Sequence, residues 1–242
     1  MKDKNYGKEY FAHDLDKSWY SRVPKGKRIR HGAWLKRYLK GAIESRGRIL
    51  EVGCGLGFLA KYLEAEDNFK IIGLDISKYA IQMAKSRTSG ACFLVASAEK
   101  LPFKPGAFHS VIALDVIEHL VRPEDFVNST FNVLKSGGML ILKTPNLESY
   151  GARKKGDSSF IWGDKTHISV KRISEWREIL KKGGFTIIKD GTDTLWDVPY
   201  WKFIPSFLQK FSLIPLTIVL AFLFGFFSWH YGENYFCVSQ KK

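Results

Sequence analysis

The stretch Ile49-Leu50-Glu51-Val52-Gly53-Cys54-Gly55-Leu56-Gly57 decides the fold. It is a short apolar run that breaks into three glycines at alternate positions. Because glycine has no Cβ and tolerates positive φ, a strand that ends in this way can turn sharply and bring its backbone close to a ligand. The stretch therefore predicts a buried strand followed by a loop that cradles a cofactor.

A second apolar run, Ile71-Ile72-Gly73-Leu74, ends in Asp75, which lies eighteen residues after Gly57. A carboxylate at this position can accept hydrogen bonds from both hydroxyls of a ribose. Strand, glycine loop, helix, strand and acid together describe a nucleoside-binding βαβ unit. A dinucleotide fingerprint would place its third glycine at Phe58, so the spacing argues against a pyrophosphate ligand.

The rest of the chain alternates strands and helices with short connections, which indicates an α/β fold with a doubly wound sheet. The expected strands cover residues 48–52, 70–74, 92–95, 108–114, 139–143 and 186–189, with a last strand at 233–239. The expected helices cover residues 58–64, 78–86, 123–134 and 172–182. We expect Ser136-Gly137-Gly138 to end the third of these helices and residues 147–170 to form a polar connection.

Five motifs resemble the class I S-adenosylmethionine (SAM) methyltransferases and occur in the order found in that family. They are E-x-G-x-G-x-G over residues 51–57, Asp75, Ala-Glu-Lys-Leu-Pro-Phe at 98–103, Val-Ile-Glu-His-Leu at 116–120 and Gly-Gly-Met-Leu-Ile-Leu at 137–142. The resemblance covers residues 48–145 and continues more weakly to the end of the chain, except over residues 195–232. It implies a seven-stranded Rossmann-like sheet whose last strand is antiparallel.

The resemblance also implies SAM as the cofactor and S-adenosyl-L-homocysteine as its product. The positions that match the cofactor contacts of the family are Glu51, Gly53, Cys54, Gly55, Gly57, Asp75, Ile76, Ser97, Ala98, Glu99, Leu114 and Asp115. Ser97 departs from the family pattern, in which an aspartate accepts from the adenine amino group. A serine hydroxyl can still accept that hydrogen bond, but it is shorter and uncharged.

Arginines before the first strand are candidates for the methionine carboxylate of SAM, since a guanidinium can form two parallel hydrogen bonds to a carboxylate. Arg30 is the first candidate, and Arg28 and Arg37 are nearly as good.

Methyl transfer from a sulfonium is an in-line displacement, to which a protein contributes mainly position and the exclusion of water. A base is needed only when the acceptor carries a proton of high pKa. His119 and His167 are the candidate bases, with Asp115 and Glu118 nearby, because the pKa of an unperturbed imidazole lies near neutrality. The strong alternative is that His119 is a packing residue whose hydrogen bonds are satisfied within the protein.

The three cysteines, Cys54, Cys92 and Cys237, are far apart and have no C-x-x-C spacing. Neither a disulfide framework nor a zinc site is indicated, and we expect no metal site. Free cysteines suit a reducing cytoplasm, and residues 1–5 lack the apolar run of a signal peptide. We therefore expect a cytoplasmic protein, with peripheral contact to the inner face of the membrane as an extension of that prediction.

The net charge of +14 is concentrated outside the predicted cofactor core. Residues 1–48 carry 14 basic and 5 acidic side chains, whereas residues 49–150 carry 10 and 11. This distribution suits an anionic partner, either membrane headgroups or nucleic acid, although a solvated basic face is an equal alternative. Apolar residues at helical spacing between Trp34 and Ile43 predict a helical lead-in that packs beside the sheet.

The C-terminal part contains a long apolar stretch, with no charged residue from Phe211 to Trp229. About 20 apolar residues are needed to cross a bilayer, so the length is borderline. Because residues 233–239 resemble the last strand of the sheet, which must lie on the same side of a membrane as the other strands, we expect an insertion between the last two strands. It could lie on a bilayer surface, fold back as a lid over an apolar substrate, or pack against a second copy in a homodimer.

These observations divide the chain into four parts. They are a helical N-terminal cap at 1–47, a SAM-binding core at 48–194, an apolar aromatic insertion at 195–232 and the final strand at 233–242. The leading hypothesis is a SAM-dependent methyltransferase that acts on a small lipophilic acceptor at a membrane surface.

Two alternatives stay open. A nucleic-acid methyltransferase, acting on RNA or tRNA, would suit the charge, but enzymes that methylate base amines usually place N-P-P-[YF] where this chain has Leu114-Asp115-Val116-Ile117, and no separate RNA-binding module is visible. A membrane-associated SAM-binding protein without catalytic activity is the other alternative.

Overall fold

The computed structural model describes residues 6–11, 47–64, 70–213, 215 and 228–242. The predicted lead-in helix around Trp34 to Ile43 and the three candidate arginines, Arg28, Arg30 and Arg37, lie outside the described residues. Within the first described segment, residues 8–11 form a single helical turn.

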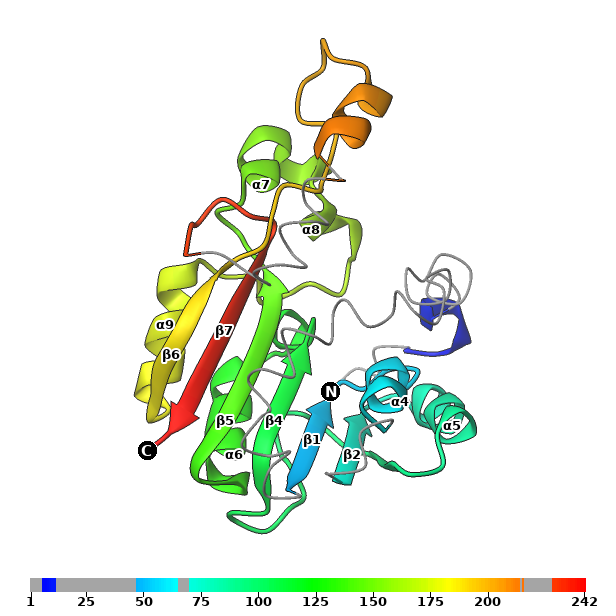
Figure 1. The fold of residues 1–242 in the computed structure, drawn as a ribbon, viewed down its shortest axis with the longest axis vertical. Helices are drawn as coiled ribbons and strands as arrows, with labels where there is room; N and C mark the ends of the chain where they lie inside the picture. The colour runs from blue at the N-terminus through cyan, green and yellow to red at the C-terminus, as the bar shows by residue number, and fades with distance from the viewer. Residues whose placement is uncertain (1–5, 12–46, 65–69, 214, 216–227) are drawn as a thin grey trace.

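The core is a seven-stranded sheet with the order β3-β2-β1-β4-β5-β7-β6 (Figure 1). The strands are β1 (Arg48–Val52), β2 (Lys70–Asp75), β3 (Cys92–Val95), β4 (Phe108–Leu114), β5 (Leu134–Pro145), β6 (Phe185–Thr192) and β7 (Asn234–Lys241). The first five pair in parallel, and β7 runs antiparallel to both β5 and β6. The predicted sheet, with its antiparallel last strand, is confirmed.

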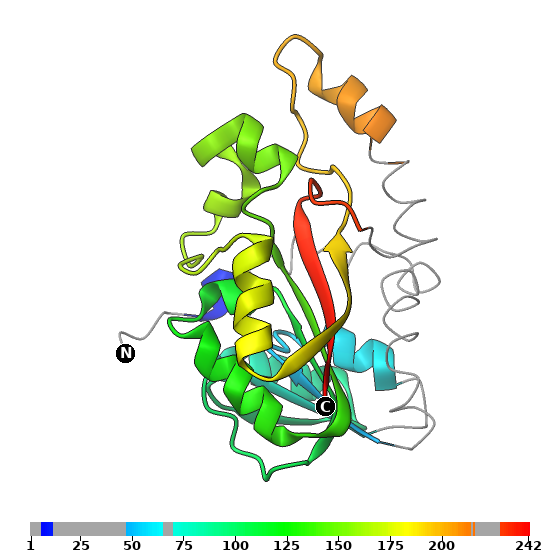
Figure 2. The same cartoon turned by 90° about the vertical axis from the view of Figure 1, so that its left-hand side faces the viewer.

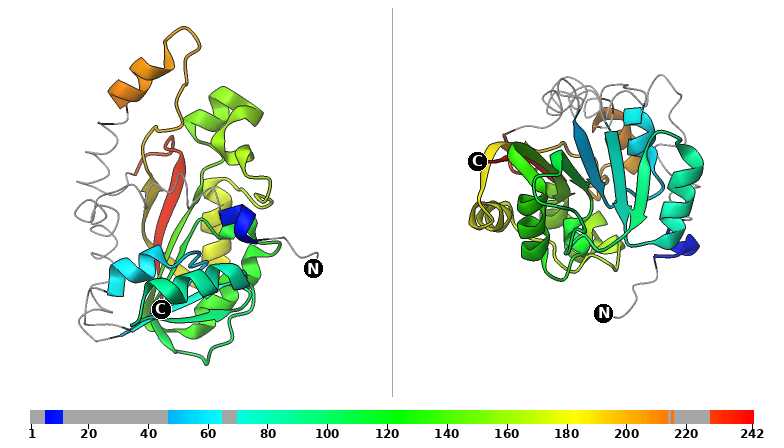
Figure 3. Two further views of the ribbon diagram at one scale, coloured as in Figure 1. Left: turned by 90° about the vertical axis from the view of Figure 1, so that its right-hand side faces the viewer. Right: turned by 90° about the horizontal axis from the view of Figure 1, so that it is seen from below.

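Helices cover both faces of the sheet (Figures 1 and 3). On one face, α4 (Phe58–Glu64) and α5 (Lys78–Arg87) pack over a cluster that includes the fully buried Ile49. On the other face, α6 (Pro123–Val133) and α9 (Ile173–Lys182) bury Phe126 and Trp176 against a cluster that includes Leu50. Consecutive residues of β1 therefore serve opposite layers, as the period of two in a strand requires.

The predicted boundary between α6 and β5 is wrong. The helix ends at Val133 and the strand begins at Leu134, so Ser136-Gly137-Gly138 lies within β5 and does not form a helix-ending turn. The physical reason is that Leu134 is completely buried and pairs with Phe108 of β4, which extends the ladder before its register shifts. Gly137 has a φ of +75° inside this irregular stretch, a conformation that suits glycine.

The connection predicted over residues 147–170 contains three short helices that the sequence pattern did not indicate. They are α7 (Tyr150–Lys155), the 3₁₀ helix η2 (Gly156–Ser158) and α8 (Phe160–Gly163). Helices of three to six residues are too short for the apolar periodicity on which the prediction depends. Ser149 begins α7 by accepting a hydrogen bond from the amide of Ala152 at 3.0 Å.

Residues 195–213, which follow β6, extend away from the sheet, and their helix at residues 206–213 lies at the far end of the molecule (Figure 2). Gln209 holds this segment together from a buried position. Its side-chain amide donates to the carbonyls of Trp201 and Ile204, both at 2.7 Å, and accepts from the amides of Tyr200 and Trp201. Among the residues that the structure describes, no helix combines the length and apolar character needed to cross a bilayer.

Candidate active site

The site lies at the carboxyl ends of the parallel strands, where β1 and β4 are neighbours although they are not consecutive in the chain. Ligands of doubly wound sheets bind at such a switch point because the connections on its two sides run to opposite faces. The structure brings the sequence-predicted residues to this one edge, after β1 (Glu51 to Gly57), after β2 (Asp75 and Ile76), after β3 (Ser97 to Glu99) and after β4 (Leu114 to His119).

The three glycines of the loop after β1 all have positive φ, of +67° at Gly53, +48° at Gly55 and +77° at Gly57. A Cβ on Gly53 would lie 2.3 Å from Val116 Cγ2, and one on Gly57 would lie 2.7 Å from the Cβ of Ala84. Gly53 and Gly57 are therefore required by packing as well as by conformation. Among the described residues, a Cβ on Gly55 would contact only the ring of Phe11, at 3.7 Å, so these residues leave room for a ligand at Gly55.

Asp75 joins this loop to the end of β2. Its carboxylate accepts from the amide of Gly55 at 2.9 Å and from the amide of Ser77 at 2.8 Å. Burial raises the pKa of Asp75, while the amides of Ser77 and Gly55 oppose that rise. A carboxylate offers about four lone-pair sites, so it can still accept from two hydroxyls. The next residue, Ile76, is half exposed and lies beside it.

Glu51 is buried beneath the loop. Its Oε2 atom has no hydrogen-bond partner among the described residues. Burial, and secondarily the charge of Asp75, raises the pKa of Glu51 to about 8. A buried carboxyl with an unused oxygen is a position where a cationic ligand would be stabilised. Cys54 is also buried, and burial raises the pKa of its thiol, so it is a packing residue of the loop and not a reactive one.

The segment after β3 is held by its own hydrogen bonds. Ser97 accepts from the amide of Glu99 through Oγ at 3.2 Å, and Glu99 accepts from the amide of Arg122 at 2.8 Å. Ala98 is buried between them. The Ser97 hydroxyl already accepts one hydrogen bond, but it has a second lone pair. It can therefore still accept a hydrogen bond from an adenine amino group.

At the end of β4, Leu114 is partly buried and Asp115 has a φ of +57°, the one positive value at a non-glycine residue in the described part of the chain. Asp115 forms an ion pair with Lys143 of β5, with Nζ 2.5 Å from Oδ2. Non-glycine residues in this backbone conformation cluster at functional sites, where the surrounding structure compensates the strain.

His119 follows on the short helix η1 (Ile117–His119) and is fixed by a chain of hydrogen bonds. Its Nδ1 lies 2.8 Å from Thr166 Oγ1, and the same hydroxyl donates to Asp164 Oδ1 at 2.6 Å. Because a hydroxyl has only one proton, Thr166 accepts from His119, which places a proton on Nδ1 of His119. This network fixes the orientation of the His119 ring.

His167 lies beside His119, with 4.9 Å between the ring centroids. Its Nδ1 contacts the carbonyl of Ile161, which can only accept, so Nδ1 of His167 carries a proton as well. Glu118 completes the group. Its side chain is fully buried, and burial and the charge of Asp115 raise its pKa to about 8. The two candidate bases therefore lie together.

Two tyrosines from the first described segment close this side of the site. Tyr10 donates to Asp164 at 3.3 Å, and the ring of Tyr6 lies edge-on to His119 with 6.5 Å between centroids. Burial raises the pKa of both phenols, so they are neutral donors. Sequence reasoning missed these tyrosines as site residues, together with Asp164 and Thr166. The signal for Asp164 and Thr166 was the polar run at residues 164–167, which carries no spacing rule. The signal for the tyrosines was their position in the predicted N-terminal cap at residues 1–47.

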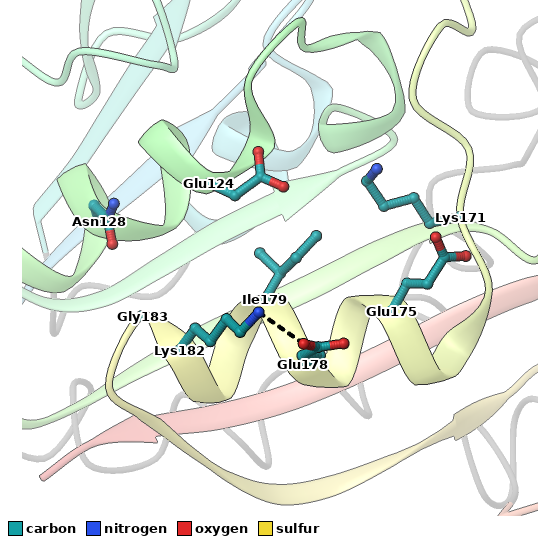
Figure 4. A pocket seen from close by; sticks show the side chains of 8 residues that line it. All are labelled: Glu124, Asn128, Lys171, Glu175, Glu178, Ile179, Lys182 and Gly183. Atoms are coloured by element: carbon teal, nitrogen blue, oxygen red, sulfur yellow. Dashed lines mark ion pairs between the residues drawn. The ribbon is translucent and has the colours of Figure 1, made fainter.

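A groove of about 360 Å³ lies elsewhere, between α6 and α9 (Figure 4). Its lining residues are Glu124, Asn128, Lys171, Glu175, Glu178, Ile179, Lys182 and Gly183. None of them belongs to the switch-point edge, and Glu178 and Lys182 are paired with each other at 2.7 Å. We assign no role in the site to this groove.

Comparison with known proteins agrees with this geometry. A family model described as "Methyltransferase domain" matches residues 50–142, which contain the glycine loop, Asp75 and His119. A protein from Methanocaldococcus jannaschii, described as uncharacterized protein MJ1123, is 33% identical over 147 residues, which are 60% of this chain and 67% of that protein. Residues 50–142 of the chain form a methyltransferase domain of the class I SAM-dependent family.

Squalene methyltransferase 2 of Botryococcus braunii is 27% identical over 189 residues, covering 71% of this chain and 49% of the relative. A SAM-dependent methyltransferase of Archaeoglobus fulgidus has the same fold, with a TM-score of 0.65 at 17% identity over 97% of this chain and 100% of the other. The chain spans between about half and two thirds of the length of the curated relatives that it matches.

SAM is the cofactor of this methyltransferase family, and the residues present fit it. The ligand carries a ribose with two hydroxyls, which suits the remaining lone pairs of Asp75. It also carries a sulfonium and an ammonium, both cationic, which suit the buried Oε2 atom of Glu51, an oxygen that accepts no hydrogen bond from the described residues. The space above Gly55 gives the backbone access to the ligand.

Proposed function

We propose that the protein transfers a methyl group from SAM to a small lipophilic acceptor at a membrane surface. The observation that carries the chemistry is the meeting of two sets of residues at one edge of the sheet. The loop at Gly55 and the carboxylate of Asp75 would hold the cofactor, and His119 with His167 would face the acceptor.

The reaction is an in-line displacement on the methyl carbon. The bond from sulfur to the methyl carbon breaks as the bond from an acceptor oxygen or other nucleophile forms, and the electron pair remains on sulfur. An acceptor hydroxyl releases its proton to the Nε2 lone pair of His119 or His167. The hydrogen bond to Thr166 occupies Nδ1 of His119, so Nε2 is the nitrogen that would take this proton.

The lipophilic character of the acceptor is supported by the end of the molecule near residues 200–213. Phe203, Phe207 and Phe211 are exposed by 101%, 67% and 82%, and Ile204 and Leu208 are exposed beside them. An apolar patch of this kind on a soluble fold marks a contact with a membrane or a partner. Lys202 and Lys210 flank it, which suits anionic headgroups. The name of the squalene methyltransferase relative points to the same class of acceptor.

Incubation of the purified protein with methyl-labelled SAM and a total lipid extract tests the chemistry. Labelled product should appear in the organic phase, and separation of the products would identify the acceptor. If none of the lipid fractions contained the methyl label, the proposal of a lipophilic acceptor would be contradicted. Turnover on RNA, with binding that weakens steeply as salt increases, would favour the nucleic-acid alternative.

Sedimentation with anionic vesicles tests the membrane contact separately. The unaltered protein should sediment, and a triple variant with Phe203, Phe207 and Phe211 changed to Ser should remain in solution. The matched control is Val121→Ser, which removes an exposed apolar side chain after η1, outside the 200–213 segment. Equal sedimentation of the triple variant would contradict the proposal. A dimer that only the triple variant abolishes would indicate that the patch binds a second copy.

A further inference from the structure

We infer that Glu118, His119 and His167 form a binding site for a single transition-metal cation of the Zn²⁺ type. One carboxylate oxygen and two imidazole nitrogens from these residues all lie within 4.8 Å of one another. Two residues come from the end of β4 and one from the segment after α8, so the site exists only in the folded chain.

Glu118 supplies the strongest argument. Its side chain is completely buried, and Thr144 donates to Oε2 at 3.0 Å. The other oxygen, Oε1, has no hydrogen-bond partner among the described residues, and it lies 4.0 Å from His119 Nε2. A buried carboxylate oxygen without a donor is costly unless a proton or a cation satisfies it. This oxygen lies toward two imidazoles. Imidazole and carboxylate ligands bind transition-metal cations together, so the grouping favours a shared cation.

The second argument is the orientation of the imidazoles. Histidines that bind a metal through one nitrogen donate from the other to a carbonyl or carboxylate, which fixes the tautomer and raises ligand basicity. His167 donates from Nδ1 to the carbonyl of Ile161, and His119 donates from Nδ1 to Thr166, which in turn donates to Asp164. Both rings therefore have the second contact that metal-bound histidines have.

The donor set selects the class of cation. Two imidazoles and one carboxylate suit Zn²⁺ and similar ions, whereas Mg²⁺ prefers oxygen ligands. A zinc ion about 2.1 Å from each ligand atom requires tetrahedral ligand atoms that lie about 3.4 Å from one another. Small rotations of the imidazole rings would bring the three ligand atoms from their present separations to that spacing. Three protein ligands leave one coordination position open, as in catalytic zinc sites.

The open position gives the site a role that rests on the proposed function. A hydroxyl acceptor bound to the cation would lose its proton more readily, because the positive charge stabilises the oxyanion. With the cation bound, the two imidazoles would hold the metal, and the cation would lower the pKa of the acceptor hydroxyl. Metal binding itself does not depend on the acceptor, so it can be measured alone.

Titration calorimetry of the chelator-treated full chain with ZnCl₂ tests the inference, without SAM or acceptor present. We expect one high-affinity equivalent of Zn²⁺, no comparable binding of Mg²⁺, and a visible absorption band of four-coordinate Co²⁺ when cobalt replaces zinc. His119→Ala, His167→Ala and Glu118→Gln should each weaken zinc binding by at least about 10-fold, as the loss of even an outer-shell partner does. Circular dichroism would confirm that each variant is folded.

His230→Ala is the matched control, since His230 is an exposed histidine outside the cluster. It should retain the affinity of the unaltered protein. Absence of a high-affinity equivalent, or zinc affinity that is unchanged in His119→Ala and His167→Ala, would overturn the inference. Either result would leave the proposed methyl transfer intact, because SAM binding and turnover are measured in separate experiments.

Discussion

The cofactor edge of the site, residues 51–57 and 75–77, differs in construction from the acceptor edge, which combines residues 6–10, 118–119 and 164–167. Among the residues of the cofactor edge themselves, the hydrogen bond that spans most sequence joins Gly55 to Asp75, twenty residues apart. One contact leaves this edge over a long distance, since Ser77 donates to the carbonyl of Tyr6 across 71 residues. In the acceptor edge His119 contacts Thr166 across 47 residues, and Tyr10 contacts Asp164 across 154. One edge depends on backbone conformation and the other on long-range side-chain contacts, so substitutions should separate them.

The largest expected effect is on turnover in His119→Ala. Loss of a positioned proton acceptor, or of a metal ligand at the same place, should lower kcat by about 10²–10⁴-fold, while the affinity for SAM stays within about 2-fold because His119 is on the acceptor edge. Steady-state kinetics with the acceptor identified from lipid extract, together with calorimetry of SAM, measures both. His230→Ala is the control. If SAM affinity falls as much as turnover does, the two edges are not separable.

Gly53→Ala should mainly lower stability. A non-glycine residue at φ +67° costs about 1–3 kcal/mol, and the new Cβ, 2.3 Å from Val116, adds an overpacking cost of about 1–3 kcal/mol. Urea unfolding measures the change. Gly106→Ala isolates the backbone contribution, because Gly106 has a φ of +64° and no atom within 4 Å of the added Cβ. Equal losses in the two variants would show that packing against Val116 is not a constraint.

Asp75→Asn should weaken SAM binding by about 10–100-fold, because hydrogen bonds to a charged acceptor contribute roughly 1.5–3 kcal/mol. The change keeps the size of the side chain, and the amide oxygen can still accept from Gly55 or Ser77. Calorimetry with S-adenosyl-L-homocysteine is the measurement. Asp125→Asn alters an exposed aspartate that pairs with Arg122 and should leave affinity unchanged. Unaltered affinity in Asp75→Asn would contradict the cofactor assignment.

The smallest expected effect concerns Glu233, at the base of the segment that carries the exposed phenylalanines. Burial is the main cause that raises its pKa to about 7, although Tyr200 donates to Oε1 at 2.5 Å. Because the folded pKa lies above the unfolded value, the contribution to stability is complete below the unfolded pKa near 4.5 and is lost as pH rises through about 7.

Glu233→Gln, which imitates the protonated form, should therefore flatten the fall in unfolding free energy between pH 5 and pH 8. Glu178→Gln is the control, since Lys182 lowers the pKa of the exposed Glu178 and its titration is complete below that range. An unchanged slope in Glu233→Gln would assign the pH dependence to other buried acids, such as Asp193, whose pKa burial raises to about 6.

The sheet and the cofactor edge followed from the sequence because their determinants are short-range. A short apolar run specifies a buried strand, and glycine is the residue that most readily adopts a positive φ, so residues 51–57 could be interpreted from their own sequence. The boundary at Leu134 could not be predicted in this way. Its place in β5 depends on pairing with Phe108, and a glycine pair after a helix has the same local signature as a helix-ending turn.

The acceptor edge was decided by the tertiary structure. The sequence indicated His119 and His167 as separate candidates, but nothing in their spacing showed that the rings would lie 4.9 Å apart, that Thr166 and Asp164 would fix the orientation of the His119 ring, or that Tyr6 and Tyr10 would close over them. The reason is physical. Contacts between side chains distant in the chain depend on how the sheet and its connections pack, whereas the conformation of a glycine loop is set by its own residues.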